Sequence, residues 1–548
     1  MLKKSGQAQI VYNSKIINDN LGMNMEVEVP QIEISNRTPE VNKLYLIIER
    51  LFAKCQEQEN TIELLKEEIN RIKGHKGKPK IGPSKMDSDK KGNNKGRHNP
   101  GRMNRKALKK EEVIIKAPNV PEGSRFKGYQ DYTIQELVIE AKTVNYRLER
   151  WQSPDDQYIF AKLPEEIKGY HFGPILRSYI EHQNLLGVTE PQILEQLRAI
   201  GIKISAGEIS HLLIDNKESF HQEKNEILQA GISSSKYINV DDTGARHDGK
   251  NGFCTHIGNE LFAWFSSTES KSRINFLELL RGKHKDYVVD KNAIEYMQRE
   301  KMPKAILDEI KKNKRAFDNK EIYIRNLNRA GIKKEGRLLK VAIEGALIGS
   351  VLLHGFSVNL KIISDDAGQF NIFQHALCWI HAERLINRLV PLSENQAKII
   401  ETVLNKFWVI YADLKAYKLN PSQEEKKRIT KCFDELCATE SSYPLSGALQ
   451  RLARNKKELL LVLKYPEIPL HNNLSENDIR EYVKKRKISG GTRSALGRQY
   501  RDTFISLKKT CRKLGVNFWE YLLDRNNKTG RVPHLPTLIG HVSLLNSS

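Results

Sequence analysis

One segment limits what the rest of this chain can fold into. Residues 73–110 contain 14 basic and 2 acidic residues, several glycines and prolines, and almost no apolar side chains. A segment of this composition cannot bury enough apolar surface to fold by itself, so we interpret residues 74–111 as a flexible basic linker. Any hydrophobic core must therefore form before this linker or after it.

The positive charge of the chain is concentrated in two places. The formal net charge is +23. The stretch 73–110 contributes +12, and residues 480–531, with 15 basic and 4 acidic residues, contribute +11, so the remainder is about neutral. Concentrated positive charge favours a polyanionic partner, because each neutralised phosphate releases counterions. We therefore expect the partner to be nucleic acid; two solvated basic surfaces are the simpler alternative.

The composition excludes several classes of protein. Hydrophobic residues make up 39% of the chain, a value typical of globular domains. We find no run of about 18 apolar residues, so we expect no transmembrane helix, and the N-terminal sequence does not have the pattern of a signal peptide. The six cysteines form no CxxC pair, which favours a reducing compartment over a disulfide framework. These features predict a cytoplasmic, nucleoid-associated protein without membrane contact.

A heptad pattern precedes the basic linker. Alternating spacings of four and three residues connect nine positions: Leu44, Ile48, Leu51, Cys55, Gln58, Ile62, Leu65, Ile69 and Ile72. The pattern predicts a helix over residues 41–73 that forms a coiled coil with another copy of the chain. A lone amphipathic helix is the alternative. Residues 1–40 show no clear periodicity and are predicted to be disordered or loosely attached.

Two further regions are predicted after the linker. Residues 112–168 alternate in the manner of strands and predict a small β-containing module. Residues 169–232 are predicted to form a helix-turn-helix that binds DNA, although a helical bundle without DNA contacts would show the same pattern. Its signals are a helix over Phe172–Leu186, a cap at Thr189, a turn at Gly201, and a helix over Ala206–Leu213 capped by Ser205.

From Lys236 the pattern changes to strands and then to helices. In chain order it predicts a strand over 236–241, a hairpin of 253–258 with 261–265, a helix over 271–281, mostly helical residues over 291–355, a strand over 360–364, helices over 370–465, and final helices from about 475 to 523. Alternating strands and helices of this kind favour an α/β domain.

Three acids stand at positions that suit metal chemistry. Asp241 and Asp365 each end an expected strand, and Glu476 opens an expected helix. A buried carboxylate is costly unless a cation balances its charge, and three carboxylates can hold two Mg²⁺ ions about 4 Å apart. An Asp after a strand is also often a turn former or a helix cap, and Asp242 or Asp366 could be the ligand instead.

The chain from about residue 230 to 525 resembles the insertion-sequence-66 family of DDE transposases. The resemblance rests on VDDTGARHDGKNGFCTHIGNELFAWF, on IISDDAGQFNIF followed by ALCWIHAERLINRL, and on LHNNLSENDIREYVKKRKISGGTRS with the tail TFISLKKTCRKLGVNFWEYL. It implies a catalytic core of RNase H-like type, a mixed sheet with flanking helices and helical insertions. We assign this core to 233–375 and 466–530, a helical insertion to 376–465, and a C-terminal tail to 531–548.

The resemblance also implies roles for single residues. Asp241, Asp365 and Glu476 would be the catalytic acids and would bind two Mg²⁺ or Mn²⁺ ions. Asp242, Asp366 and Asn473 are candidates to support these ligands. Asp290 remains an alternative second acid, because it ends a strand-like run where a minimal RNase H topology places that residue.

Basic residues after Glu476 are candidate DNA contacts. A helix that starts at the metal site would place them along the bound strand, and Gly490 and Gly491 would permit close approach of the backbone. These basic candidates are Lys484, Lys485, Arg486, Lys487 and Arg493. Ser205, in the predicted helix-turn-helix, is a further candidate DNA contact.

Four soft side chains could in principle bind zinc. These are Cys254, His256, Cys378 and His381, and they could do so only if an expected strand and an expected helix meet. We favour packing roles for all four, and a core position for Trp379.

Together these features predict a transposase. It would carry out metal-dependent DNA strand cleavage and 3′-OH strand transfer of an insertion-sequence element, acting on the terminal repeats of the element and on target DNA. One alternative is an inactive or domesticated relative that acts as a DNA-binding regulator. Another is a nuclease of RNase H-like type that cleaves DNA without joining it.

Overall fold

The computed structural model describes residues 17–18, 24–25, 38–39, 41 and 112–545, except 313, 333–334, 392 and 442–443. The chain divides into two compact units, Met1–Asp131 and Tyr132–Ser548. In the first unit, β1 (Ile17–Asn18) pairs antiparallel with β2 (Asn24–Met25). The predicted coiled coil and the predicted basic linker lie outside the described residues and stay predictions.

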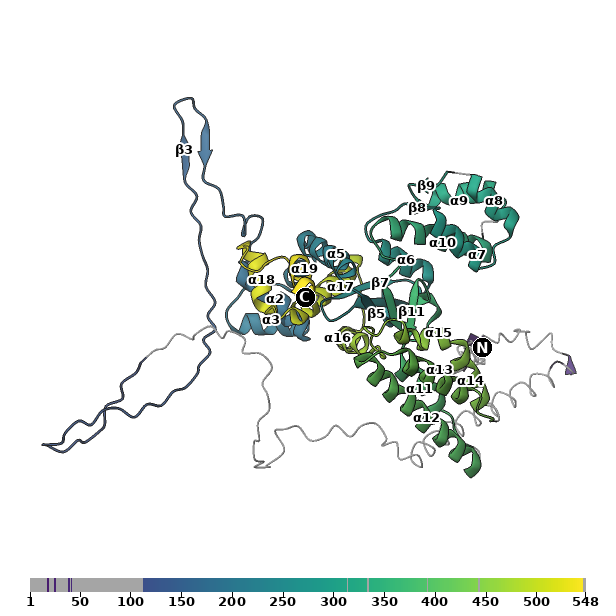
Figure 1. The fold of residues 1–548 in the computed structure, drawn as a ribbon. Helices are drawn as coiled ribbons and strands as arrows, with labels where there is room; N and C mark the ends of the chain where they lie inside the picture. Colours follow the sequence, from purple (N-terminus) through teal and green to yellow (C-terminus); the bar gives the residue numbers. More distant parts are fainter. Residues whose placement is uncertain are drawn as a thin grey trace, which may run out of the picture. The chain divides into compact units, whose positions relative to one another are not determined.

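A five-stranded mixed sheet forms the core of the second unit (Figure 1). In spatial order its strands are β11 (Gln374–Leu377), β10 (Lys361–Ser364), β5 (Tyr237–His247), β6 (Lys250–Gly258) and β7 (Ala263–Thr268). β5, β6 and β7 are antiparallel neighbours, whereas β10 is parallel to both β5 and β11. Asp248 and Gly249 make the tight turn between β5 and β6 with positive φ angles of 46° and 72°, which an Asp-Gly pair tolerates well.

Strand β5 is longer than the sequence predicted. The expected strand ended at Asp241, but β5 continues to His247 because β6 pairs with it along its whole length beyond Asn239. β10 pairs only with residues 237–239. Asp241 therefore lies inside the β5–β6 ladder on one side and just beyond the end of β10 on the other.

Helix α17 (Ala495–Lys513) covers the edge strand β7 with polar side chains. Backbone N–H groups of β7 donate to three of them: Ala263 to Thr510 (3.2 Å), Phe265 to Ser506 (2.9 Å) and Ser267 to Asp502 (2.7 Å). Two helical steps of four residues span roughly 12 Å, and two steps of alternate strand residues span roughly 13 Å. Because the two spacings match, side chains of α17 accept hydrogen bonds from N–H groups of β7 that could otherwise pair with another strand.

Two helical groups extend from the sheet in different directions (Figure 1). The first connects β7 to β10 and contains α6 (Arg273–Arg281), β8 (Tyr287–Val288), α7 (Lys291–Arg299), α8 (Lys304–Lys312), β9 (Ala316–Phe317), α9 (Lys320–Arg329) and α10 (Arg337–Leu353). The second follows β11 and contains α11 (Trp379–Asn387), α12 (Glu394–Leu419), α13 (Gln423–Cys437), α14 (Leu445–Arg454) and α15 (Lys456–Leu459).

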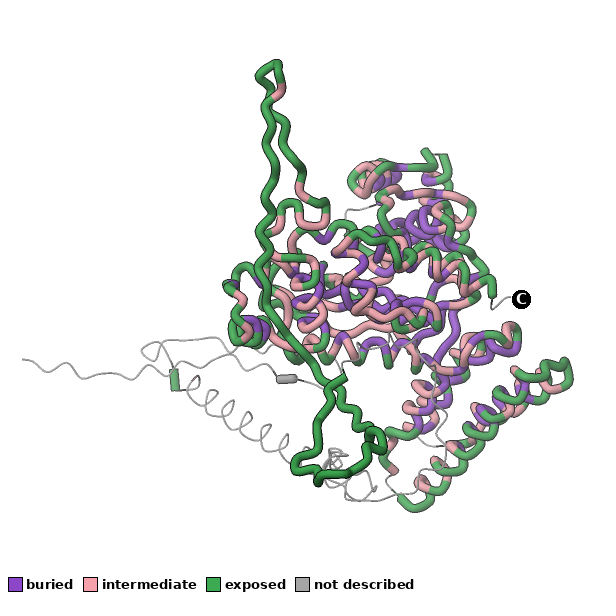
Figure 2. The backbone as a smooth tube through the Cα atoms, turned by 90° about the vertical axis from the view of Figure 1, so that its left-hand side faces the viewer, coloured by how far each residue is buried: buried purple, intermediate pink, exposed green. Residues whose placement is uncertain are grey.

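The second helical group has its own hydrophobic core. Ile363, Ala376 and Leu377 of the sheet contribute to it, and Trp379, which is 1% exposed, lies within it, as expected from the sequence. Figure 2 shows buried residues along the sheet and along the inner sides of these helices. This group corresponds to the helical insertion proposed at 376–465.

The helices before the sheet pack against the helices at the end of the chain. The first set is α2 (Pro174–Leu186), α3 (Glu190–Ala199), α4 (Ala206–Ile214) and α5 (Glu218–Ser233); its partners are α17, α18 (Phe518–Asn527) and α19 (Leu535–Leu545). The predicted tail at 531–548 is therefore wrong over α19, because Leu535 and Ile539 are fully buried. Arg525 of α18 holds Glu223 of α5 through two bonds of 2.9 Å.

Residues 112–168, for which the sequence predicted a small β-containing module, contain one strand pair and little buried surface. Residues 112–152 are exposed throughout. Within 112–168, all of which is described, the one strand pair is β3 (Arg150–Gln152) with β4 (Tyr158–Phe160). The alternating pattern has no second apolar layer to pack against here, so it yields a hairpin without a core.

No helix among the described residues combines the length and the apolar character that crossing a membrane requires.

Candidate active site

The structure brings Asp241, Asp365 and Glu476 to the same end of the sheet. Because β10 runs parallel to β5, Asp365, which follows the last residue of β10, lies next to Asp241. Glu476 lies in the first turn of α16 (Asn473–Ser489), a helix that packs against β5 and β6. Three elements that are far apart in sequence thus deliver one acid each.

The protein balances the negative charge of this cluster only in part, because one cation, Arg384, lies 3.7 Å from Glu476 Oε1. The pKa of Asp241 is raised to about 7, first by burial and then by the neighbouring charges of Asp365, Asp242 and Glu476. The Oε1 atom of Glu476 is buried and accepts no hydrogen bond. Half-buried carboxylates, one of them with a raised pKa, form a donor set that fits a divalent cation with oxygen ligands.

The second acid of each Asp-Asp pair is held by other side chains. Asp242 accepts hydrogen bonds from Thr255 Oγ1 (2.5 Å) and Gln369 Nε2 (2.8 Å). Its pKa is nevertheless raised, chiefly by burial. Asp242 therefore stands beside the cluster with both of its oxygens engaged.

Asp366 points to different partners. It accepts hydrogen bonds from Arg451 Nε (2.7 Å) and Asn455 Nδ2 (3.0 Å), and so links the end of β10 to the second helical group. The geometry thus favours Asp241 and Asp365 over Asp242 and Asp366 as the acids available to a cation.

The alternative acid Asp290 has a different place and a structural task. It caps α7, where its side chain accepts a hydrogen bond from the backbone N–H of Ala293 (2.8 Å). The short strand before it, β8, pairs with β9 and does not belong to the five-stranded sheet. In a minimal RNase H core the strand before Asp290 would join the sheet. Here that stretch belongs to the first helical group, and the strand beside β5 is β10, so Asp365 and not Asp290 lies beside Asp241.

Asn472 connects β5 and α16, the elements that carry two of the three acids. Its side chain donates to the carbonyl oxygen of Val240 (2.8 Å) and accepts from Asn239 (2.7 Å), both on β5. Its own N–H donates to Cys378 Sγ (3.2 Å), and its carbonyl oxygen accepts from Glu476 N (3.2 Å). Asn472 is fully buried, whereas Asn473, the supporting residue that the sequence suggested, is exposed.

His381, which the sequence offered only as a possible zinc ligand, and Arg384, which it did not single out, lie next to Glu476. Both lie on α11, three residues apart, and each has a nitrogen 3.7 Å from Glu476 Oε1. Arg384 Nη1 also lies 3.0 Å from His381 Nε2. Burial, reinforced by the charge of Arg384, lowers the pKa of His381, so its imidazole is neutral at pH 7. The spacing in HAER, which places both residues on one helix face, was the available signal.

The other soft ligands considered for zinc are engaged elsewhere. Cys378 Sγ accepts from Asn472, and His256 contacts Ser475 Oγ (2.5 Å) and Asp478 Oδ2 (3.2 Å). Burial opposes the ionisation of Asp478, but His256 and Lys513 outweigh it and lower its pKa to about 2. These contacts fix α16 to β6 and α17, in agreement with the packing roles favoured above.

The predicted DNA contacts fall into two groups. Lys484, Lys487 and Arg493 are exposed. Lys485 donates to the carbonyl oxygen of Asn184 and Arg486 to that of Gly244, so both stabilise this chain itself, and burial lowers the pKa of Lys485 to about 8.

Two further expectations about DNA contacts change. Gly491 faces this chain and not a ligand, because a Cβ at this position would lie 2.8 Å from the carbonyl oxygen of Arg246 on the β5–β6 hairpin. Ser205 caps α4 by accepting from Glu208 N (3.2 Å). α4 itself exposes Glu208 and carries no lysine or arginine, so any DNA contact there would depend on neighbours such as Arg198 and Lys203.

Two comparisons show which known proteins this chain resembles. Residues 350–500, which contain β10, β11, the second helical group and α16, match the family described as "Transposase IS66 family". The chain is also 43% identical over 308 residues to the "Uncharacterized protein y4jO" of Sinorhizobium fredii (strain NBRC 101917 / NGR234), a match that covers 56% of this chain and 96% of that protein. The relative is matched over nearly its whole length, and the family match contains Asp365 and Glu476. This chain belongs to the IS66 transposase family.

Proposed function

We propose that the chain is a DDE-type DNA transposase that cleaves DNA strands and joins the freed 3′-OH ends of an insertion-sequence element to target DNA. The observation that carries the proposal is the convergence of Asp241, Asp365 and Glu476 at one end of the sheet, with their charge balanced only in part by Arg384. The sheet supports an RNase H-like core, because an antiparallel run of three strands is joined by two later parallel strands next to the first.

Asp241, Asp365 and Glu476 would hold two Mg²⁺ or Mn²⁺ ions. Such ions, when bound, stabilise the charge on the attacking and leaving oxygens of a phosphodiester. Asp242 and Asn472 keep β5 and the start of α16 in place through the hydrogen bonds described above. The protein thereby fixes the separation of its three acids before DNA arrives, which limits the reorganisation needed at the moment of reaction.

Arg384 provides a positive group next to the acids. Its guanidinium can pair with a phosphate oxygen of the bound strand, and its contact with His381 holds it in position. Because the imidazole is neutral, it accepts a hydrogen bond from the guanidinium without adding a second positive charge.

DNA binding and self-association belong to the same proposal. The exposed Lys484, Lys487 and Arg493, the helices α3 and α4, and the basic residues 74–111 would contact terminal repeats and target DNA. The heptad residues would join copies of the chain into a homo-oligomer. Such a protein would act in the cytoplasm on the nucleoid. The catalytic core would comprise 233–375 and 466–530.

The test is an assay that separates cleavage from joining. A supercoiled plasmid that carries the DNA on both sides of the gene is incubated with the protein and Mg²⁺, and nicked, linear and joined products are separated. We expect wild type to form all products and Asp241→Asn to form none. Asp248→Asn is the matched control, because it removes a charge from the same hairpin at a turn position that Asn tolerates.

Each of the other outcomes would favour a different function or a different site. Equal activity of wild type and Asp241→Asn would contradict the assignment of the site. Cleavage without joining would indicate a nuclease. Binding of the DNA without cleavage in Mg²⁺ or Mn²⁺ would favour the regulator.

A further inference from the structure

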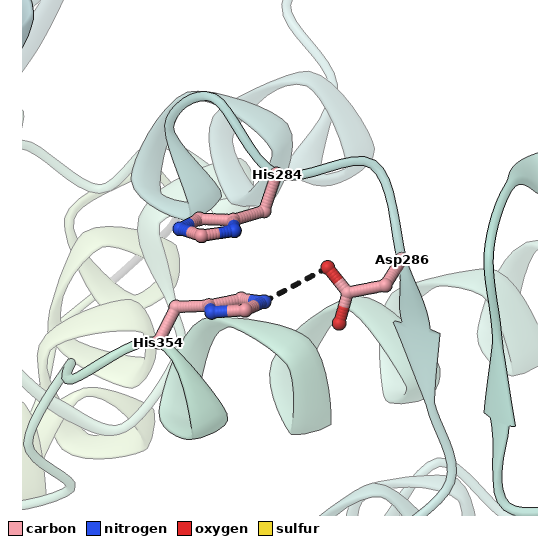
Figure 3. Close-up of side chains that lie close together, drawn as sticks. All are labelled: His284, Asp286 and His354. Carbon is pink, nitrogen blue, oxygen red and sulfur yellow. Dashed lines mark hydrogen bonds and ion pairs between the residues drawn. The ribbon is translucent and has the colours of Figure 1, made fainter.

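A second group of metal-binding side chains lies in the first helical group. Among the residues that the structure describes, one set of three or more His, Cys, Asp or Glu side chains has ligand atoms that all lie within 4.8 Å of one another: His284, Asp286 and His354 (Figure 3). His284 and Asp286 lie between α6 and β8, and His354 follows the last residue of α10. None of them takes part in the chemistry proposed above.

The contacts within this group bring its possible ligand atoms together. His354 Nε2 lies 2.9 Å from Asp286 Oδ1. The rings of His284 and His354 are stacked with centroids 3.4 Å apart and an angle of 7° between their planes. Imidazole nitrogen is a common metal ligand, so the two rings and the carboxylate offer three ligands at one place.

The backbone around the group holds the three residues together. Gly349 lets α10 approach β8 so closely that any side chain there would collide with the carbonyl oxygen of Val288. Arg281 Nη1 donates to the carbonyl oxygen of Asp286 (2.7 Å). The side chains of His354 and Asp286 are 22% and 25% exposed, so an ion from solvent can reach them. The group is thus preformed by packing and still accessible.

The chemistry of the group selects the kind of ion. Mg²⁺ takes oxygen ligands, and a single carboxylate flanked in sequence by Lys283 and Lys285 offers it little. Imidazole nitrogen binds zinc and related transition-metal ions well, and three protein ligands leave a fourth position for water. We propose that His284, Asp286 and His354 form a binding site for a divalent transition-metal ion of the zinc class.

Binding requires small movements of the side chains. Ring lone pairs lie in the ring planes, so the two parallel rings must tilt toward a shared ion. The Nε2–Oδ1 contact must open slightly, because two ligands at about 2.0–2.1 Å on a tetrahedral ion stand further apart than a hydrogen bond. The bound ion would link the loop before β8 to the end of α10. Residues 354–360 lead from this point to β10 and Asp365.

The experiment measures zinc binding by the full chain without any histidine tag. Isothermal titration with ZnCl₂ is carried out in excess Mg²⁺, which occupies carboxylate sites, and Co²⁺ absorption reports the coordination geometry. We expect one equivalent of Zn²⁺ to bind and to raise the unfolding temperature. His284→Ala and His354→Ala should each lower the affinity by more than the roughly 10–100-fold that loss of a partner outside the ligand set costs.

Matched variants show which residues bind the ion. His211→Ala removes an exposed histidine that also has an aspartate partner, Asp215, at 2.7 Å, and should leave binding unchanged. Asp241→Asn should leave this Zn²⁺ site intact, so failure of the transposase proposal and failure of this one are distinguishable. The metal-free unfolding temperatures of the two alanine variants report whether they fold. Folded variants that bind Zn²⁺ as wild type does, or a wild type that binds none, would overturn the proposal.

Discussion

The two clusters of metal-binding side chains in this protein differ in how they are assembled and in the charge they carry. Asp241, Asp365 and Glu476 come from β5, the end of β10 and α16, and their oxygens do not all lie within 4.8 Å of one another. His284, Asp286 and His354 come from one helical group and do meet that criterion. Carboxylates repel one another as like charges until a cation joins them.

This difference in ligand chemistry determines which ions and reactions each cluster suits. The carboxylates carry excess negative charge, which suits hard cations and phosphoryl transfer. The imidazoles carry little charge and favour a transition-metal ion in a structural position. Substitutions of single side chains test this comparison of the two clusters. They follow in order of the expected effect, from the largest to the smallest.

The largest effect is expected at the second acid. Asp365→Asn should lower strand cleavage by at least about a hundredfold, because metal-ion catalysis supplies several kcal/mol and each 1.4 kcal/mol is a factor of ten. Asp290→Asn should retain activity, since Asn also caps helices. Cleavage rates at saturating Mg²⁺ measure both. If Asp290→Asn were the inactive variant, the assignment of Asp365 to the catalytic cluster would be wrong.

Asn472 should be the next most sensitive position. Asn472→Ala leaves the Val240 carbonyl oxygen and the Asn239 amide without their partner, at a cost of about 1–3 kcal/mol for each buried group. Urea denaturation measures this loss, and Asn473→Ala, at an exposed neighbour, should change stability by less than about 0.5 kcal/mol.

The Mg²⁺ dependence of cleavage distinguishes a positioning role of Asn472 from a role in stability alone. If Asn472 sets the separation of the acids, the Mg²⁺ concentration for half-maximal cleavage should rise in Asn472→Ala under conditions where the protein is folded. An unchanged Mg²⁺ dependence would reduce Asn472 to a contributor to stability.

His375 on β11 gives a smaller, pH-dependent effect. It lies 2.7 Å from Ser364 Oγ, and burial lowers its pKa to about 4. Because this pKa lies below the unfolded value of about 6.5, the unfolded chain takes up the proton first as pH falls. The free energy of unfolding should therefore decrease from pH 6.5 to pH 4, by up to about 3 kcal/mol. Denaturation curves of wild type and His375→Asn across this range measure it; parallel curves would contradict the prediction.

The smallest effects per residue are expected at exposed basic side chains. Alanine at Lys484, Lys487 and Arg493 should weaken DNA binding and lower the slope of log affinity against log salt by roughly 0.9 for each duplex phosphate that the variant no longer neutralises. Lys485→Ala should instead lower stability, because this lysine bonds to Asn184. Fluorescence anisotropy at several salt concentrations separates the two. A salt slope that changes only in Lys485→Ala would reverse this assignment.

Local sequence patterns were sufficient for many elements of the fold. Capping residues at Thr189 and Ser205 and the glycine at 201 placed the bounds of α3 and α4 closely, because these signals act within one helical turn. The β6–β7 hairpin followed from alternation around Asn259. The extra length of β5 could not be seen, because it depends on pairing with β6 and not on the residues of β5 alone.

The candidate site shows the same division. The sequence alone predicted the three acids, through the family motifs that surround Asp241, Asp365 and Glu476. It could not reveal His381, Arg384 and Asn472 as their neighbours, because those contacts join helices and strands far apart in the chain. Nor could it separate Lys485 from Lys484, since burial against Asn184 is a matter of packing.

What the sequence determined by itself was chemistry and local structure: carboxylates, helix caps, turns, the concentration of basic residues, and membership of a family. The tertiary structure decided which acid of each pair is available, that Asp290 is a cap, and that two histidines and an aspartate meet at the end of α10. The physical reason is that burial, like-charge proximity and backbone pairing act between residues distant in sequence, and only the folded chain sets those distances.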